Sequence, residues 1–288
     1  TEDYVAALAA AGVNRASNGA QESDPDVQRA INRDQPFEVV ARVCGWLRRH
    51  GIARINLDLM YGLPRQTVAR VEAMVDKATS LEPARIALFG YAHVPWMKSH
   101  QKMIDEAELP DAAERFQQFD AAAARLARLG YVAVGLDHFA RDDDGLARAA
   151  TSGRLHRNFQ GYTTDEASTL IGFGASAIGS LPQGYAQNLS PLKDYRDKVV
   201  AGELPTARGF ALEEEDRLRA EIIETLMCGL GCDVAAVARR HGQAPGSLAG
   251  DLARLAPLIE DGLAVIENGT IRVTEAGRPF VRVVASVF

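Results

Sequence analysis

The chain has 288 residues, 47% of them hydrophobic, which is enough for one large or two modest globular domains. Its formal net charge is -6, with 32 basic and 38 acidic residues, so no chain-wide positive field attracts nucleic acid or anionic lipid. Three cysteines are too sparse for a disulfide scaffold, and no apolar run is long enough to span a membrane. We therefore expect a soluble, cytoplasmic protein without a nucleic-acid or membrane partner. The chain begins with Thr1 rather than Met, so we also expect further residues upstream.

The first half of the chain alternates strand-like segments with amphipathic helices. Strands are predicted at residues 14–19, 53–61, 85–91 and 131–136. Between them, apolar side chains recur at helical spacing, as at Val39, Val43, Trp46 and Leu47. Such alternation is typical of βα units around a parallel sheet, and we interpret the apolar stripes as core packing.

The middle of the chain loses this periodicity. Residues 142–205 are rich in glycine and polar side chains, and a long stretch of this kind is more often a binding segment than a passive connector. Its first residues, the acidic run at 142–144, predict a solvated helix start, because acidic side chains favour the positive end of the helix dipole.

The end of the chain has the outline of a winged helix. A helical region is expected from about Leu212, followed by two shorter helices and a hairpin. The hairpin strands, residues 263–267 and 270–273, are joined by Asn268-Gly269, the dipeptide that a tight two-residue turn prefers.

Charged and amide side chains follow the predicted strands, at the edge where barrels and α/β sheets bind ligands. Gln21 follows the first strand, Asp58 lies late in the second, and His93 closes the third. Asp58 lies among apolar residues, where an unpaired carboxylate is costly, so it should face a pocket or pair with a cation. A structural salt bridge is the alternative. Arg33 could be that partner, could bind a ligand carboxylate, or could simply end a solvent-facing helix.

We expect no metal ligands in this chain. The histidines His93, His138 and His156 lie near strand ends or in the irregular segment, and no pair has the helical spacing of a zinc motif. Cys228 and Cys232 follow an apolar helix without a second Cys or His pair, so we interpret them as structural.

Basic and aromatic residues gather in the irregular segment. Arg154, His156 and Arg157 come just before the sequence NFQGY at residues 158–162. Because guanidinium groups bind carboxylates and aromatic rings cover ring faces, this combination favours an anionic, flat and partly apolar ligand.

Several segments, in order along nearly the whole chain, resemble the oxygen-independent coproporphyrinogen III oxidases, a radical-SAM family. The most specific are DHFAR at residues 137–141 and LHRNFQGYTT at residues 155–164. The supporting segments are NRDQ at 32–35, DLMYGLP at 58–64, YAHVP at 91–95, GASAI at 174–178 and YAQN at 185–188. Haem chaperones of the same superfamily share the barrel segments but usually not HRNFQGYTT.

The resemblance implies an α/β fold, the C-terminal half of a radical-SAM (β/α)6 partial barrel followed by a mostly helical, winged-helix-like C-terminal domain. We accordingly divide the chain into three parts. They are the half-barrel at residues 1–140, an irregular segment covering substrate and SAM at 141–205, and the helical winged-helix-like domain at 206–288.

The resemblance also implies an oxidoreductase of haem and porphyrin biosynthesis, which oxidatively decarboxylates coproporphyrinogen III to protoporphyrinogen IX. The family uses a SAM-derived radical, a 4Fe–4S cluster with an electron donor, and two SAM molecules. The positions that match its cofactor contacts are Gln21, Arg33, Asp58, Ala92, Ile178, Phe159, Gln160 and Gly161. The candidate substrate contacts are His93, Arg154, His156 and Arg157. The resemblance assigns no catalytic residue, and we expect a monomer.

The CxxxCxxC loop that holds the family's cluster has no counterpart in this chain. We therefore expect the chain to be a fragment or an incomplete part of the enzyme and to be inactive alone. A haem chaperone of the same superfamily, a winged-helix DNA-binding regulator and an inactive interaction module are the alternatives. The regulator's would-be recognition helix, residues 247–259, carries Asp251 and a single arginine, Arg254, a poor surface for phosphates.

Overall fold

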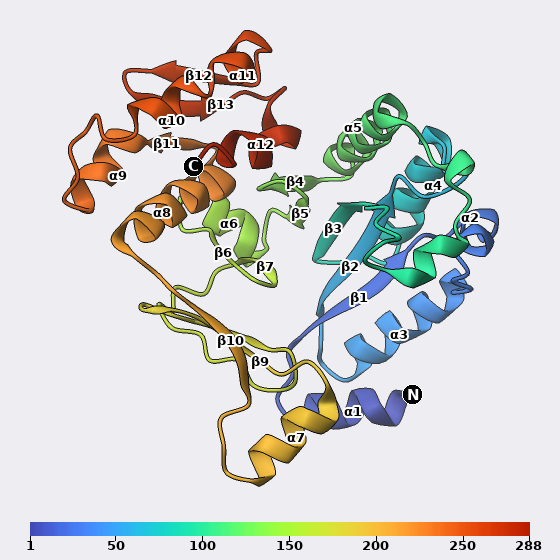
Figure 1. Cartoon of the computed structure of the whole chain (residues 1–288). Coiled ribbons are helices and arrows are strands. Elements are labelled where there is room, and N and C mark those ends of the chain that lie inside the picture. Colours follow the sequence, from blue (N-terminus) through green and yellow to red (C-terminus); the bar gives the residue numbers. More distant parts are fainter. The chain divides into compact units, whose positions relative to one another are not determined.

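The computed structural model describes residues 1–288, which form two compact units, Thr1–Thr151 and Ser152–Phe288 (Figure 1). Each unit has its own sheets and helices. None of the helices is both long and apolar enough to cross a membrane. The finer division of the chain into parts ending at residues 140 and 205 stays a prediction.

The first unit contains a five-stranded sheet in the order β1-β2-β3-β5-β4. Its strands are β1 (Arg15–Gln21), β2 (Arg54–Tyr61), β3 (Arg85–Gly90), β4 (Tyr131–Val134) and β5 (His138–Arg141). β1, β2 and β3 are parallel, whereas β5 runs antiparallel to both β3 and β4. The four predicted strands are confirmed. The sequence does not predict β5, because its 4 residues are too few to show an alternating pattern.

Six α-helices and two 3-10 helices surround this sheet. They are α1 (Glu2–Ala10), α2 (Pro25–Ala30), α3 (Phe37–Arg49), α4 (Val68–Thr79), η1 (Ser99–Met103), η2 (Glu106–Glu108), α5 (Ala112–Arg128) and α6 (Gly145–Thr151). Thr67 caps α4, and Asp111 and Glu114 form a capping box at α5. These caps satisfy free backbone N–H groups and so fix where the loops that follow β2 and β3 end.

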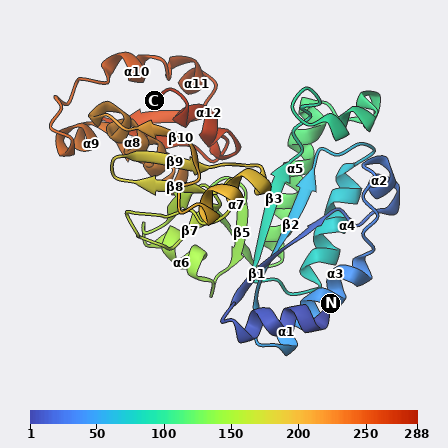
Figure 2. The same cartoon turned by 60° about the horizontal axis from the view of Figure 1, so that its bottom comes forward.

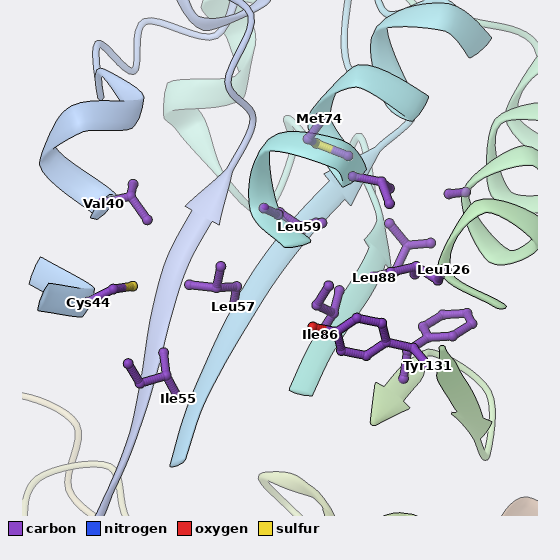
Figure 3. Packing of buried hydrophobic residues seen from close by; sticks show 14 of the residues in the cluster. Val40, Cys44, Ile55, Leu57, Leu59, Met74, Ile86, Leu88, Leu126 and Tyr131 are labelled. Atoms are coloured by element: carbon purple, nitrogen blue, oxygen red, sulfur yellow. The ribbon is translucent and has the colours of Figure 1, made fainter. Parts of the chain in front are cut away.

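The core of the first unit lies between the helices and one face of the sheet (Figures 2 and 3). Alternate apolar residues of two central strands belong to it: Ile55, Leu57 and Leu59 of β2 and Ile86 and Leu88 of β3. The apolar stripe predicted for α3 contributes Val43, Trp46 and Leu47. Burial of each large side chain stabilises the unit by roughly 1.5–3 kcal/mol. Because strand residues alternate, the other face of the sheet is free to carry polar groups.

The second unit begins with short antiparallel strands. They are the hairpin β6 (His156–Asn158) and β7 (Gly161–Thr163), and the sheet of β8 (Ile178–Leu181), β9 (Gly184–Asn188) and β10 (Thr206–Ala211), in the order β10-β9-β8, with α7 (Leu192–Val200) between β9 and β10. These elements lie mainly in the stretch that the sequence predicts to be irregular. Their glycine-rich strands lack apolar alternation, which is why periodicity does not reveal them.

The second unit ends in helices and a three-stranded sheet in the order β11-β13-β12. The elements are α8 (Glu214–Gly229), β11 (Gly231–Asp233), α9 (Val234–Arg240), α10 (Ala249–Ala253), α11 (Ala256–Glu260), β12 (Ala264–Glu267), β13 (Thr270–Val273), η3 (Arg278–Phe280) and α12 (Val281–Ala285). The predicted hairpin is confirmed, with Asn268 (φ 52°) and Gly269 (φ 78°) in the left-handed conformation that its turn requires. The single recognition helix expected at residues 247–259 is wrong. Two short helices, α10 and α11, replace it, and Pro257 lies in the first turn of α11, the part of a helix that tolerates proline.

Candidate functional site

The face of the first unit's sheet that points away from the core carries Asp58, which is half-buried. Ser17 Oγ donates to Asp58 Oδ1 at 3.1 Å, and Asn56 Nδ2 donates to the same oxygen at 2.6 Å. In the strand register Asp58 lies between Gly19 of β1, which has no side chain, and Ala87 of β3, which has a small one. Asp58 therefore holds a charge that only neutral donors contact, and it can accept further hydrogen bonds from an amino group or hydroxyls.

Arg33 and Gln21 meet over Gly19. The Nη2 of Arg33 donates to the Gly19 carbonyl at 2.9 Å, and its Nε donates to Gln35 Oε1 at 3.0 Å. A Cβ atom on Gly19 would lie 2.8 Å from Gln21 Nε2 and 3.4 Å from Arg33 Nη2, so the missing side chain lets both approach the sheet. Arg33 bonds to no carboxylate, so its interpretation as the partner of Asp58 is wrong. Its exposed guanidinium is held from one side and is available to a ligand carboxylate.

The segment after β3 is fixed by side chains from other elements. Gln101 Nε2 donates to the Ala92 carbonyl at 3.0 Å, and Gln101 Oε1 accepts from the Val94 N–H at 2.6 Å. Arg115 Nη2 donates to the Tyr91 carbonyl at 2.7 Å. Ala92 itself is exposed. The backbone at Ala92 is thus rigidly placed at the carboxyl end of β3, beside the strand that carries Asp58.

His93 joins a buried phenol to an exposed carboxylate. Its Nδ1 lies 2.9 Å from Tyr91 Oη, and its Nε2 lies 2.9 Å from Glu106 Oε1. A proton on Nε2 would be donated to Glu106, which leaves Nδ1 to accept from the Tyr91 hydroxyl. Burial raises the pKa of Tyr91. Because both ring nitrogens of His93 have protein partners, a substrate contact from this residue would replace one of them.

The second unit contains a cavity of about 630 Å³. His156, Arg157 and Phe159, three residues predicted from the sequence, line it together. The ring of Phe159 meets that of Tyr185 edge to face, 5.4 Å between centroids. His156 Nδ1 lies 3.1 Å from Glu224 Oε1, which also accepts from the backbone N–H of Arg157 at 3.2 Å. The cavity thus combines aromatic faces with charges of both signs.

Three acidic residues that the sequence does not predict as site residues also line this cavity: Asp165, Glu166 and Glu224. Glu224 lies 68 positions after His156, on α8, so no local pattern links the two. Asp165 and Glu166 directly follow the segment HRNFQGYTT, and their position in the chain is a signal that could have suggested them.

The remaining predicted residues of the second unit lie outside the lining of that cavity. Gln160 lies in the turn of the β6–β7 hairpin, Gly161 (φ 125°) begins β7, and Ile178 begins β8, paired with Gln187. Arg154 Nε donates to Ser152 Oγ at 3.2 Å. The structure therefore groups Gln21, Arg33 and Asp58 in one unit and His156, Arg157 and Phe159 in the other.

The cysteines have the environment of buried thiols. Burial raises the pKa of Cys228 to about 12 and that of Cys232 to about 11, and it also raises the pKa of Cys44. Metals bind the thiolate, which burial disfavours here. No cluster of three or more His, Cys, Asp or Glu side chains is placed to hold a metal ion.

Comparisons with known proteins identify the family. A family model described as the radical SAM superfamily matches residues 1–78, and one described as the HemN C-terminal domain matches residues 212–280. A protein of Thermostichus vulcanus named oxygen-independent coproporphyrinogen III oxidase is 42% identical over 279 residues, which cover 96% of this chain and 86% of that protein. The chain belongs to the oxygen-independent coproporphyrinogen III oxidase family. The resemblance read from the sequence is thereby confirmed.

Other members of the oxygen-independent coproporphyrinogen III oxidase family support this placement. The Bradyrhizobium diazoefficiens protein of that name is 50% identical over 288 residues, all of this chain but 64% of the relative. The solved structure of coproporphyrinogen III oxidase (HemN) from Escherichia coli, described as a radical SAM enzyme, is 37% identical with a TM-score of 0.93. The match covers 100% of this chain and 66% of the Escherichia coli chain. The predicted fold class is confirmed, and the chain spans about two thirds of these relatives.

Radical SAM membership implies SAM and a 4Fe–4S cluster as the family's cofactors. The residues of this chain fit the first and not the second. The exposed guanidinium of Arg33 and the half-buried carboxylate of Asp58 match the opposite charges of an amino acid moiety. The three thiols do not fit a cluster, because Cys44 lies in the first unit's core and the pKa values of Cys228 and Cys232 are strongly raised.

Proposed function

We propose that this chain supplies part of the SAM and substrate sites of a coproporphyrinogen III oxidase. The proposed reaction converts two propionate groups of coproporphyrinogen III to vinyl groups with loss of carbon dioxide, giving protoporphyrinogen IX. The observation that carries the proposal is the meeting of Arg33 and Gln21 over Gly19, beside Asp58, in a chain 50% identical to a protein of that name. An electron donor is the proposed partner, the cytoplasm the proposed location and a monomer the proposed state.

Arg33 and Asp58 would bind the two ends of the methionine part of SAM or its ribose. The guanidinium of Arg33 binds the carboxylate, and the carboxylate of Asp58 accepts from the amino group or from ribose hydroxyls. Gln21, beside Arg33, adds an amide that can donate or accept. SAM, when bound and reductively cleaved, supplies the radical that removes hydrogen from the substrate. The residues of this chain bind and orient it.

A second SAM molecule and the substrate are proposed to use the remaining residues. Ala92 and Ile178 are proposed as further SAM contacts, and Phe159, Gln160 and Gly161 are proposed to contact the second SAM molecule or the substrate. In the cavity, Arg157 and His156 suit propionate groups, and the Phe159–Tyr185 corner suits a ring face. The acidic residues of the cavity can accept hydrogen bonds from pyrrole N–H groups. Arg154 and His93 are proposed as more distant substrate contacts.

Replacement of Arg33 or Asp58 tests the cofactor assignment. Arg33→Ala and Asp58→Ala should each weaken SAM binding by about tenfold or more, because a charge-assisted hydrogen bond contributes about 1.5–3 kcal/mol. Isothermal titration calorimetry measures the affinity. Arg29→Ala is the matched control, since Arg29 is an exposed arginine of α2 whose partner is Asp26. Unchanged affinity in the first two variants would refute the assignment.

The activity itself is tested with the natural full-length protein under anaerobic conditions. Mass spectrometry should show loss of two carboxyl groups from coproporphyrinogen III, and Arg157→Ala should raise KM for the substrate because a propionate partner is lost. A protein that binds haem stoichiometrically and leaves coproporphyrinogen III intact would instead be a haem chaperone.

A further inference from the structure

All six buried polar side chains of this chain lie in the first unit, and five of them lie close to the loops that follow β1, β2 and β3: Glu22, Gln28, Gln66, Gln101 and Gln118. The sixth, Asp144, bonds to Arg85, the first residue of β3, and so lies at the opposite end of the strands. Buried polar groups are costly unless every donor and acceptor is paired, so their concentration at one edge calls for a reason.

Glu22, which is 3% exposed, directly follows Gln21. Its Oε1 accepts from the N–H groups of Ser23 at 2.6 Å and Asp24 at 2.9 Å. Its Oε2 accepts from Gln66 Nε2 at 2.5 Å. The carboxylate therefore shapes the turn after β1 and joins it to the loop after β2. Burial raises the pKa of Glu22, whereas these donors lower it.

The amide orientation of Gln66 is fixed by its other partners. Its Oε1 accepts from the Leu63 N–H at 3.0 Å, and its Nε2 also donates to the Met60 carbonyl at 2.9 Å. Turning the amide over would set donor against donor and acceptor against acceptor. Residue 22 must therefore present an acceptor to Gln66 and another to the turn, which a carboxylate does and an amide cannot.

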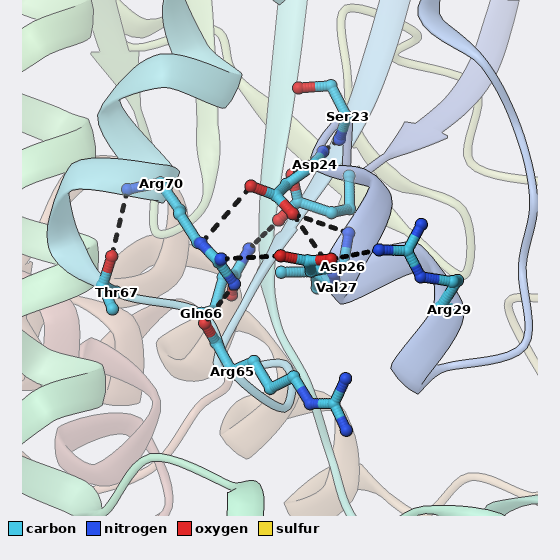
Figure 4. Close-up of polar contacts among 10 residues, drawn as sticks. Ser23, Asp24, Asp26, Val27, Arg29, Arg65, Gln66, Thr67 and Arg70 are labelled. Carbon is cyan, nitrogen blue, oxygen red and sulfur yellow. Dashed lines mark hydrogen bonds and ion pairs between the residues drawn. The ribbon is translucent and has the colours of Figure 1, made fainter.

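Gln118 of α5 extends these bonds from the other side. Its Nε2 donates to the Gln66 carbonyl at 2.8 Å, and its Oε1 accepts from the Gly62 N–H at 2.9 Å. On the outer surface of the same region, Arg70 pairs with Asp24 at 3.3 Å and with Asp26 at 3.1 Å (Figure 4). The loops after β1 and β2 are thus tied together by buried bonds and by surface ion pairs.

Gln28 and Gln35 continue the bonds to Arg33. Gln28 Nε2 donates to the carbonyls of Glu22 and Gln35, both at 2.7 Å, and Gln28 Oε1 accepts from the Gln35 N–H at 3.1 Å. The Gln35 side chain donates to the Gly19 carbonyl at 3.1 Å and accepts from Arg33 Nε at 3.0 Å. We call Glu22, Gln28, Gln35, Gln66 and Gln118 the glutamine layer.

We propose that the glutamine layer positions Gln21 and Arg33 for SAM, with the Glu22–Gln66 hydrogen bond as its central link. The proposal rests on the proposed function, which gives these two residues to SAM. Gln21 has a backbone φ of 54°, a conformation that a non-glycine residue holds only when its surroundings fix it. The Glu22 turn fixes it from the following residue, and Gln35 fixes Arg33. The neutral amide of Gln35 holds Arg33 without neutralising the guanidinium.

Glu22→Gln tests the positioning role at nearly constant size. An amide at position 22 faces a donor whichever way it turns, so SAM affinity should fall by about tenfold, the effect of a lost charge-assisted bond. Gln35→Ala, which alters a half-buried residue and not the buried carboxylate, should lower the affinity in the same direction. The double variant Glu22→Gln, Gln66→Glu restores a donor–acceptor pair and should recover part of the lost affinity, which a general loss of stability would not do.

Asp144→Asn is the matched control, because it alters the buried acid at the opposite end of the strands. It should lower the unfolding temperature but leave SAM affinity within about twofold at a temperature where the protein is folded. Equal affinities for the native chain and Glu22→Gln would overturn the proposal while leaving the SAM assignment intact.

Hydrogen exchange of the ligand-free chain provides a readout that does not depend on SAM binding. In Glu22→Gln, peptides covering residues 19–35 should exchange faster, while those covering residues 131–151 should not change. Uniformly unchanged exchange would refute the positioning role, even if the native chain failed to bind SAM and the proposed function were lost on that ground.

Discussion

The two ends of the first unit's sheet are stabilised by different kinds of interaction. Where β1 and β2 end, amides and one carboxylate bond mainly to backbone groups, and the guanidinium of Arg33 keeps its charge. Where β3 begins, Arg85 Nε pairs with Asp144 Oδ1 at 2.8 Å, and the Asp144 side chain is 3% exposed. The first end keeps a charge available to a ligand, whereas the second neutralises charge within the fold.

The second end also shows what happens when charges are not neutralised. Arg15 of β1 lies opposite Arg54 of β2 in the strand register, and Asp144 is the acid that Arg85 contacts there. The pKa of Arg15 is lowered by partial burial and by the positive charges of Arg85 and Arg54. Repulsion between arginines is therefore tolerated at this end, whereas the ligand end leaves the guanidinium of Arg33 bonded to neutral groups alone.

The largest effect should come from breaking the buried ion pair. Asp144→Ala leaves Arg85 buried without a counterion and removes the acceptor for the Leu146 N–H, so stability should fall by about 3–5 kcal/mol. Urea unfolding measures the loss. Asp143→Ala, which alters an exposed acid, should change stability by less than about 0.5 kcal/mol. If Asp144→Ala lowered the unfolding free energy by less than about 1 kcal/mol, water molecules would have to solvate the guanidinium of Arg85 in place of Asp144.

A smaller loss is expected when a neutral link at the ligand end is removed. Gln118→Leu keeps the size of the side chain but leaves the Gly62 N–H and the Gln66 carbonyl unpaired, so stability should fall by about 1–3 kcal/mol. Gln117→Leu, on the exposed side of α5, is the control and should be nearly neutral. Equal stability of the two variants would contradict the account of the glutamine layer.

Glu22 should give the ligand end a dependence on pH. Burial raises the folded pKa of Glu22 above its ordinary value of 4.5, so the folded state binds the proton more tightly than the unfolded state. The resulting stabilisation is fully present below that value and is lost as the pH rises through the folded pKa. The difference in unfolding free energy between the native chain and Glu22→Gln should therefore shrink from acid to neutral pH. A difference that grows from acid to neutral pH would show that folding lowers the pKa of Glu22.

The smallest effect should be a gain. Arg54→Gln removes one of the repelling charges at the start of the strands, so stability should rise by up to about 0.5 kcal/mol at low salt. The gain should disappear in about 1 M salt, which screens such charges. Thermal unfolding at two salt concentrations measures it, and a loss of stability would mean that Arg54 has an unrecognised favourable contact.

The sequence predicts the parts of the fold that have a local signature. The alternation of Ile55, Leu57 and Leu59 reveals a strand, and Asn268-Gly269 reveals a hairpin turn. Asp58 is predicted as a site residue because it is a carboxylate among apolar residues late in that strand, and the structure places it on the polar face beside Ser17. Local spacing is enough for these conclusions, since each depends on neighbours within one element.

Contacts between distant segments could not be predicted. The acidic run at residues 142–144 predicts a solvated helix start, yet Asp144 is buried because Arg85, 59 positions earlier, reaches it. Likewise Glu22 and Gln66 are 44 positions apart. Nothing in either local sequence distinguishes these residues from surface polar residues, and only the strand order brings their partners together.

Gly19 gives the ligand edge a steric control point. A Cβ atom at position 19 would lie 2.8 Å from the amide nitrogen of Gln21, whose side chain would have to move, and 3.4 Å from Nη2 of Arg33, an ordinary contact distance. A single methyl group there would displace the amide of Gln21 without altering any charge or hydrogen-bonding atom of the side chains. Gly19→Ala therefore changes the shape of the edge and keeps its charges, so it separates shape from electrostatics as the source of recognition.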